Sequence, residues 1–336
     1  MGNSCFHKRH SRNISLKLSV GSSRSIQNEG FPEAFSQGKQ IQWKLGELLA
    51  EGRFCKVHQC IDMKSGELLV LKSYPTSRSS SNFIQEVKKI KKEAAILKTL
   101  EHRNVIGLCQ IETSSESLDL LMECIPGGCL EEILSKYGAL EEEIVKNYLK
   151  QLVEVLVYLS SMNISHNNLF SHNVYITSSG TVKLSGFKNF TYYSGSTELV
   201  TSKILDNHQF LAPEALTGTV CKNSDIWSLG LLVIHMITGK QPLGYLAKDS
   251  NGIMKVLASG NFDLVFPKCS ENFLNFLKAC LKLNQLERPS INDLLHFDLF
   301  TGKKTSRSDP LGDESMKASL SRTADCQMAI PEISFK

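Results

Sequence analysis

Long apolar runs are missing from this sequence of 336 residues. The longest candidate, residues 229–237, is interrupted by Gly230 and His235, whereas a membrane-spanning helix needs about 18 or more consecutive apolar residues. The opening residues 1–12 are polar and basic, so they do not form the apolar core of a secretory signal peptide. Hydrophobic residues nevertheless make up 41% of the chain and charged residues 21%, which excludes a mostly disordered chain.

Paired cysteines are missing as well. Ten cysteines are spread along the chain, but none forms a Cys-x-x-Cys motif and none has a nearby pair of histidines. This spacing argues against a disulfide framework or a zinc site, and it predicts a reducing, cytoplasmic compartment. The formal net charge is only +4, and no basic stripe is interleaved with aromatic residues, so we expect no nucleic-acid partner.

Composition divides the chain into three zones. Residues 1–41 are rich in serine and basic residues, and residues 301–336 are again polar. Neither segment can bury enough apolar surface to offset the loss of chain entropy, so we expect both tails to be disordered. Residues 42–300 have a continuous globular composition, which predicts one large folded unit between the tails.

Hydrophobic periodicity changes inside the globular segment. Its first part has mostly the pattern of strands, interrupted by one helix over 83–100 whose apolar residues recur at helical spacing. After the turn at 126–128 the spacing is that of long helices. The sequence therefore predicts an α+β fold with a small strand-rich lobe at 42–123, a connection at 124–128 and a larger helical lobe at 129–300. The predicted strands are 44–49, 57–62, 68–74 and 118–123, and the predicted long helices are 141–162, 224–238 and 271–283.

Residues 43–57 resemble the glycine-rich loop of protein kinases, whose pattern G-x-G-x-x-G-x-V brings the backbone close to the phosphates of ATP. The pattern would place glycines at positions 50, 52 and 55. The chain has Ala50, Gly52 and Cys55 there, followed by Val57. Because two of these positions carry side chains, we expect the loop to hold phosphates more weakly.

Further motifs follow in the order and spacing of the protein kinase family. Lys72 ends a segment that matches V-A-I-K, and Glu93 lies in the predicted helix where the family places the partner of that lysine. The other matching motifs are A-P-E at 212–214, D-x-W-S-x-G at 225–230 and Arg288-Pro289. The chain thus resembles a eukaryotic protein kinase over 42–300. This resemblance implies a bilobal fold with a small antiparallel β-sheet lobe, which carries one helix, and a larger helical lobe.

Several segments are most similar to the MAP kinase kinase kinase group. Residues 125–130 resemble its F-V-P-G-G-S-L, residues 148–152 its Y-T-K-Q-L, and residues 236–242 its M-V-T-G-K-P-P. This resemblance implies a place in kinase signalling, with active protein kinases or other cascade components as protein partners.

The resemblance also implies roles for individual residues. Lys72 would form an ion pair with Glu93 and hold ATP phosphates, and Asn173 would be a metal ligand. Two alternatives stay open, since Lys72 can pair with Glu93 without a nucleotide and Asn173 can hydrogen-bond to loop backbone instead. The residues implied at the nucleotide are Leu49, Gly52, Val57, Lys72, Glu123 and Cys124. The residues implied to have structural roles are His166, Phe187, Glu214, Asp225 and Arg288.

The catalytic motifs of the family are incomplete. Where the family has H-R-D-L-K-x-x-N, residues 166–173 read HNNLFSHN. Asn168 stands in place of the general base, and an amide cannot take up and hold a proton at neutral pH. Phe170 replaces the lysine of the phosphate site. Gly186 replaces the metal-binding aspartate of D-F-G, so that position offers magnesium no side-chain oxygen.

These losses predict a pseudokinase, meaning a catalytically inactive kinase domain, that acts as a scaffold or allosteric regulator of kinase signalling. ATP binding stays open, and we do not expect magnesium to bind in the manner of the family. One alternative is a weak or atypical serine/threonine kinase that uses Lys72, Asn173 and another acid such as Asp206. The other is an ATP-binding conformational switch without phosphoryl transfer.

The N-terminal residues match part of a lipid-anchor pattern. Gly2 stands where myristoylation occurs, Cys5 can be palmitoylated, and Lys8 and Arg9 are basic, which together would supply the two signals that stable anchoring needs. Phe6, however, replaces the Ser or Thr of the myristoylation pattern. The alternatives are therefore an acylated N-terminus that contacts the membrane surface and a disordered basic tail of a cytoplasmic protein.

Overall fold

The computed structural model describes residues 40–52, 54–76, 81–193, 197–199, 208–216, 219–247, 250–259 and 264–301. The chain divides into two units, residues 1–301 and 302–336, and all the described residues belong to the first. Nearly all of both tails, the acylation candidates Gly2 and Cys5, and Asp206 lie outside the described residues. The expectations for them stay predictions.

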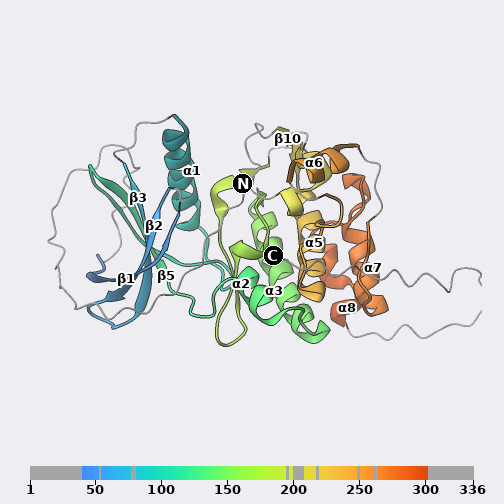
Figure 1. Ribbon diagram of the computed structural model, residues 1–336, viewed down its shortest axis with the longest axis horizontal. Coiled ribbons are helices and arrows are strands. Elements are labelled where there is room, and N and C mark those ends of the chain that lie inside the picture. Colours follow the sequence, from blue (N-terminus) through green and yellow to red (C-terminus); the bar gives the residue numbers. More distant parts are fainter. Residues whose placement is uncertain are drawn as a thin grey trace, which may run out of the picture. The chain divides into compact units, whose positions relative to one another are not determined.

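Five antiparallel strands form the sheet of the small lobe, in the spatial order β1-β2-β3-β5-β4 (Figure 1). At the turn between β2 and β3, Asp62 accepts hydrogen bonds from the Lys64 N–H (2.9 Å) and the Ser65 hydroxyl (2.6 Å). Gly66 follows with φ +75°, a left-handed conformation that glycine adopts without strain. The strands are β1 (Trp43–Glu51), β2 (Lys56–Asp62), β3 (Leu68–Pro75), β4 (Leu108–Thr113) and β5 (Ser117–Glu123).

The four predicted strands of this lobe are confirmed, but the sequence pattern does not predict β4. Gln110 and Glu112 interrupt its apolar residues, so the segment lacks the run of apolar or β-branched residues that indicates a strand. It becomes a strand because it pairs along β5. The predicted helix is also confirmed, with bounds shifted to α1 (Ser81–Leu97).

Helices make up most of the large lobe, and α5 lies at its centre (Figure 1). Every residue of α5 from Ser224 to Met236 is buried, which fits a helix that is apolar on nearly all sides. The helices are α2 (Leu130–Tyr137), α3 (Glu142–Ser161), α4 (Pro213–Leu216), α5 (Ser224–Thr238), α6 (Ser250–Ser259), α7 (Glu271–Cys280) and α8 (Asp298–Thr301).

Short strands and 3₁₀ turns connect these helices. Three antiparallel pairs form, β6 with β9, β7 with β8, and β10 with β11. Their bounds are β6 (Ile164–Ser165), β7 (Val174–Ile176), β8 (Val182–Leu184), β9 (Thr191–Tyr192), β10 (Thr197–Leu199) and β11 (Thr219–Cys221). The 3₁₀ turns are η2 (Ser171–Asn173), η3 (Phe187–Asn189), η4 (His208–Phe210), η5 (Gln285–Glu287) and η6 (Asp293–His296).

One hydrophobic core runs through both lobes. It includes Tyr74 of β3 and Leu97 of α1 in the small lobe, and Phe187 and Trp227 in the large lobe. A smaller cluster lies on the sheet apart from this core and contains Cys60, Leu69, Leu71 and Leu121. Among the helices that the structure describes, none combines the length and the apolar character needed to cross a bilayer.

Candidate functional site

The loop that carries Asn168 is anchored on the first turn of α5. The carboxylate of Asp225 accepts hydrogen bonds from the Ser165 hydroxyl (2.7 Å), the His166 N–H (2.7 Å) and the Asn167 N–H (2.8 Å). Asp225 and all three donor residues are buried, so these charge-assisted bonds fix the course of the loop. Asp225 therefore holds the loop to α5 through three hydrogen bonds.

His166 ties this loop to the segment at 185–187. Its Nε2 lies 3.0 Å from the Ser185 carbonyl oxygen, and its ring packs edge-on against Phe187 with the ring centroids 4.6 Å apart. Burial lowers the pKa of His166, because desolvation disfavours the charged imidazole. A neutral ring with the proton on Nε2 donates to the carbonyl and satisfies this geometry.

Asn168 and Asn173 are both hydrogen-bonded to the protein backbone. Asn168 Nδ2 donates to the Gly186 carbonyl oxygen (2.8 Å), and Asn173 Nδ2 donates to the Asn168 carbonyl oxygen (2.8 Å). The Ser185 N–H donates in turn to the Asn173 carbonyl oxygen (2.8 Å). Of the two alternatives that the sequence leaves open for Asn173, the structure thus has the backbone hydrogen bond.

Gly186 borders the space that Asn173 fills. It adopts φ +82° and directly precedes η3. A Cβ added at this position would overlap the side-chain amide of Asn173, so no room is left there for an acidic side chain. Within the described residues, no group of three or more His, Cys, Asp or Glu side chains is arranged to hold a metal ion. Because magnesium prefers carboxylate and phosphate oxygens, the residues at 168, 173 and 186 do not fit it.

Phe170 belongs to a cluster of aromatic rings in the large lobe. Its ring centroid lies 5.7 Å from that of His172 and 6.3 Å from that of Phe210. The side chain also packs against the main core. The position that would carry a lysine in the family therefore adds apolar packing and no positive charge.

The loop between β1 and β2 directs one side chain inward. The Gly52 N–H donates to the Cys55 carbonyl oxygen (2.8 Å). The Cys55 thiol is hydrogen-bonded to the Tyr74 hydroxyl, and Cys55 packs against the main core. Burial raises the pKa of Tyr74. The side chain at the third glycine position thus contacts the protein itself, where the family has only backbone.

The other residues implied at the nucleotide lie on strands of the same sheet or directly after it. Leu49 is on β1, and Val57 of β2 is paired in register with Lys72 of β3. Glu123 ends β5, and the partly buried Cys124 follows it. The sheet therefore brings together residues that are up to 75 positions apart in the sequence (124 − 49).

Lys72 and Glu93 are near each other without forming the expected direct ion pair. The ion pairs among the described residues include none between them. Burial raises the pKa of Glu93, while the charges of Lys72 and Lys188 lower it. The described ion pairs thus lack the closed Lys72–Glu93 contact that the resemblance implied, and Lys72 acts on Glu93 only from a longer distance.

A sequence model of the protein kinase domain matches residues 43–300 and so spans both lobes. The chain belongs to the protein kinase family. This kinase-domain protein is 27% identical over 331 residues to mitogen-activated protein kinase kinase kinase 2 of Arabidopsis thaliana, which covers 88% of this chain and 50% of that relative. It is 29% identical over 283 residues to mitogen-activated protein kinase kinase kinase 3 of Homo sapiens, which covers 81% of this chain and 44% of that relative.

These comparisons confirm the resemblance to MAP kinase kinase kinases and, with the observed strands and helices, the bilobal α+β fold. The chain spans about half the length, or less, of the curated relatives it matches.

The kinase domain has a buried ion pair between Glu214 and Arg288. The Arg288 guanidinium donates from Nη1 to Oε1 (2.6 Å) and from Nη2 to Oε2 (2.8 Å) of Glu214. The Arg288 side chain is 0% exposed and lies 5.2 Å from the Trp227 ring. This two-point contact ties the A-P-E segment to the core of the large lobe, which is the structural role that the sequence implied.

An ion pair between the two lobes of the kinase domain was not predicted. The Lys183 ammonium of β8 lies 3.0 Å from Glu123 Oε1, and the same carboxylate oxygen accepts a hydrogen bond from the Gly107 N–H (2.5 Å). Glu123 was expected only at the nucleotide. A lysine between the apolar residues Val182 and Leu184 is the one signal that could have pointed to this pair.

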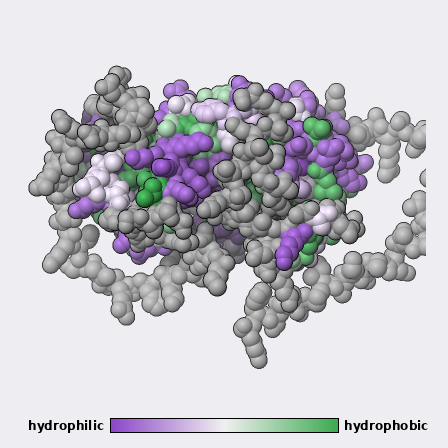
Figure 2. Space-filling view, turned by 90° about the horizontal axis from the view of Figure 1, so that it is seen from above, coloured by the Kyte–Doolittle hydropathy of each residue, from purple (hydrophilic) through white to green (hydrophobic). Residues whose placement is uncertain are grey.

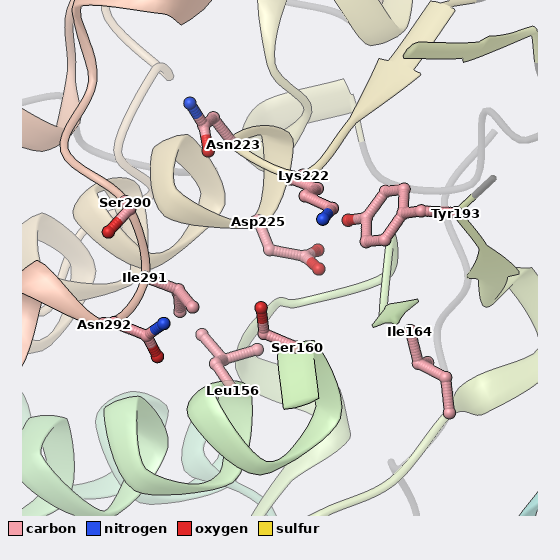
Figure 3. Close-up of a pocket in the computed structure, with 10 residues that line it drawn as sticks. All are labelled: Leu156, Ser160, Ile164, Tyr193, Lys222, Asn223, Asp225, Ser290, Ile291 and Asn292. Atoms are coloured by element: carbon pink, nitrogen blue, oxygen red, sulfur yellow. The ribbon is translucent and has the colours of Figure 1, made fainter. Parts of the chain in front are cut away.

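Asp225 also lines a cavity of about 180 Å³. In Figure 3, the Lys222 ammonium and the Tyr193 hydroxyl point toward the Asp225 carboxylate. Of the residues that the sequence singled out, only Asp225 contributes to this cavity, and its carboxylate is already bonded to residues 165–167. The lining residues are Leu156, Ser160, Ile164, Tyr193, Lys222, Asn223, Asp225, Ser290, Ile291 and Asn292.

Proposed function

We propose that this member of the protein kinase family is a pseudokinase. The observation that carries the proposal is the arrangement of Asn168, Asn173 and Gly186. The amide at the position of the base donates to the Gly186 carbonyl, and the amide of Asn173 fills the space beside Gly186. Among the described residues, the side chains at 168, 173 and 186 offer neither a carboxylate to magnesium nor a group that can take up and hold the proton of a substrate hydroxyl.

The size of the expected loss favours an inactive protein over a slow enzyme. Starting from about 1–100 turnovers per second, the loss of a general base (~10²–10⁴) and of an electrostatic stabiliser (~10²–10³) leaves about one event per minute or fewer. The factors are not strictly additive in free energy. Because Phe170 replaces a lysine of the phosphate site, we expect the rate of phosphoryl transfer to be lower still.

A transfer assay with radiolabelled ATP tests this proposal. The native chain is compared with Lys72→Met, and a MAP kinase kinase kinase with an intact H-R-D motif serves as the active control. We expect equal background incorporation for the native chain and the variant. Incorporation by the native chain above that of Lys72→Met would instead support a weak or atypical serine/threonine kinase.

We further propose that the domain acts as a scaffold or allosteric regulator in a kinase cascade. This proposal rests on relatives whose names place them among mitogen-activated protein kinase kinase kinases, and on the intact framework contacts of Asp225 and Arg288. Binding of the full chain to purified MAP kinase kinases and MAP kinase kinase kinases, measured by interferometry, tests it. Failure to bind any member of either class would contradict a role in such a cascade.

One observation favours ATP binding without transfer as a second candidate function. Among the described residues, no carboxylate forms an ion pair with Lys72, so its ammonium stays available for a phosphate group. The melting temperature is measured with ATP, in the presence and absence of magnesium. A nucleotide present at 100 times its dissociation constant stabilises the folded domain by about 2.7 kcal/mol. A melting temperature that does not change in either condition would exclude the ATP-binding switch.

A further inference from the structure

Two residues of α1 contact the segment that follows Gly186, and a third interacts with it electrostatically. The Lys188 ammonium lies 3.8 Å from Glu86 Oε1, with side chains that are only 26% and 19% exposed. Lys92 Nζ donates to the Phe190 carbonyl oxygen (3.1 Å) and lies 4.5 Å from the centre of the Phe190 ring. The third residue is Glu93, and the charge of Lys188 lowers the pKa of its carboxyl. Residues 188–190 are therefore held to α1 over nearly two helical turns, from Glu86 to Lys92.

We propose that Lys188 is a positioning residue that latches α1 to η3, so that α1 keeps its place without a nucleotide or a metal ion. Lys188 stands where the family has the glycine of D-F-G, and a glycine could not make this contact. The left-handed conformation of Gly186 starts the η3 turn that carries Lys188. This inference does not depend on whether the domain transfers phosphate.

The arrangement of charges explains why Lys188 takes this role. Glu86 and Glu93 are seven residues apart, about two turns of one helix, and both are partly buried. The positive charge of Lys188 acts on both carboxylates, through the ion pair with Glu86 and at longer range on Glu93. Lys72 acts on Glu93 without a direct ion pair. Lys188 of η3 thus compensates Glu86 directly and shares the compensation of Glu93 with Lys72.

The outer side of α1 provides a matched control. Figure 2 shows the molecule from above, the side on which α1 lies in Figure 1, and hydrophilic residues gather over that region. Lys88 is exposed on the same helix. Lys88→Met removes one positive charge, as Lys188→Met does, but it leaves the contact between α1 and η3 untouched.

Hydrogen exchange of the α1 amides in the full chain, without nucleotide, tests the latch. We expect Lys188→Met and Glu86→Gln each to raise the exchange rates by about threefold or more, as for a partly buried ion pair. Lys88→Met should stay within about twofold of the native chain. The double variant should exchange no faster than the faster single variant, because both substitutions break one contact.

Two results would overturn the latch. One is an equal effect of Lys188→Met and Lys88→Met, and the other is a double variant whose effects multiply. If a variant does not fold, amine-reactive labelling of the native chain decides the question. Lys188 should then react several-fold more slowly than Lys88, and equal labelling rates would overturn the proposal.

Discussion

Arg288 and Glu214 make the best-formed ion pair among the described residues, since both oxygens of the acid and two nitrogens of the guanidinium take part. Removing Arg288 leaves the mostly buried Glu214 carboxylate without its ionic partner, although the Ser224 hydroxyl still donates to it (2.9 Å). We expect Arg288→Ala to lower the free energy of unfolding by about 3–5 kcal/mol. The exposed pair of Arg103 with Glu154 (3.0 Å) is the control. Arg103→Ala should lower the free energy of unfolding by no more than about 1 kcal/mol. Urea unfolding measures both losses, and similar values would contradict the assignment.

Two buried histidines should make the domain less stable in mild acid. Burial lowers the pKa of His166 and of His235 in the folded chain, whereas an unfolded imidazole titrates near about 6.5. As the pH falls through that value, the unfolded chain binds protons that the folded chain does not, so the free energy of unfolding decreases. Glu93 acts in the opposite direction as the pH falls through the pKa of its carboxyl, because burial raises that pKa and the folded chain binds the proton more readily.

Melting temperatures across this range check the sign of the effect. We expect the melting temperature to fall as the pH is lowered from about 7.5 to about 5.5. His235→Gln should make the dependence on pH weaker, since one of the two buried imidazoles is then absent. A melting temperature that stays constant or rises over this range would contradict the prediction.

At the level of elements, the turn from β8 into η3 depends on a glycine and on the residue beside it. Gly186 (φ +82°) and Gly66 (φ +75°) are both left-handed, but an added Cβ would meet nothing within 4 Å at Gly66 and would overlap Asn173 at Gly186. We expect Gly66→Ala to lower the free energy of unfolding by about 1–2 kcal/mol. Gly186→Ala should lower it by about 1–3 kcal/mol more, because the crowding adds to the backbone strain.

A double-mutant cycle separates these two causes. In the Gly186→Ala background, Asn173→Ala removes the overlapping amide, so it should cost less than it does in the native chain. Denaturant unfolding of the four proteins gives the coupling energy. A coupling energy of zero would mean that Asn173 does not fill the space next to position 186.

At the scale of the whole molecule, the core is continuous between the lobes. Residues of β3 and α1 belong to the same cluster as Phe187, Trp227 and Leu299, and Glu123 is paired with Lys183 of the other lobe. We therefore expect the domain to unfold in one cooperative transition, with equal calorimetric and van't Hoff enthalpies. Two separate transitions in scanning calorimetry of the full chain would show that the lobes are independently stable.

Residue identity alone indicated the family and the catalytic motifs that are incomplete. The landmarks Lys72, Glu93 and Arg288 stand at the family's spacing, and Asn168 and Gly186 lack the required acids wherever their side chains lie. These conclusions need no coordinates, because an amide and a hydrogen atom cannot replace a carboxylate in any conformation. The helix at α1 and four of the five sheet strands also follow from local apolar spacing.

Only the tertiary structure decided which partner each polar group has. The Asn173 amide lies beside Gly186, Lys183 pairs with Glu123, and Lys188 pairs with Glu86. Strand β4 likewise exists because β5 lies next to it. The physical reason is that hydrogen bonds and ion pairs act over a few ångströms in space, and which groups come that close depends on packing between segments far apart in the chain.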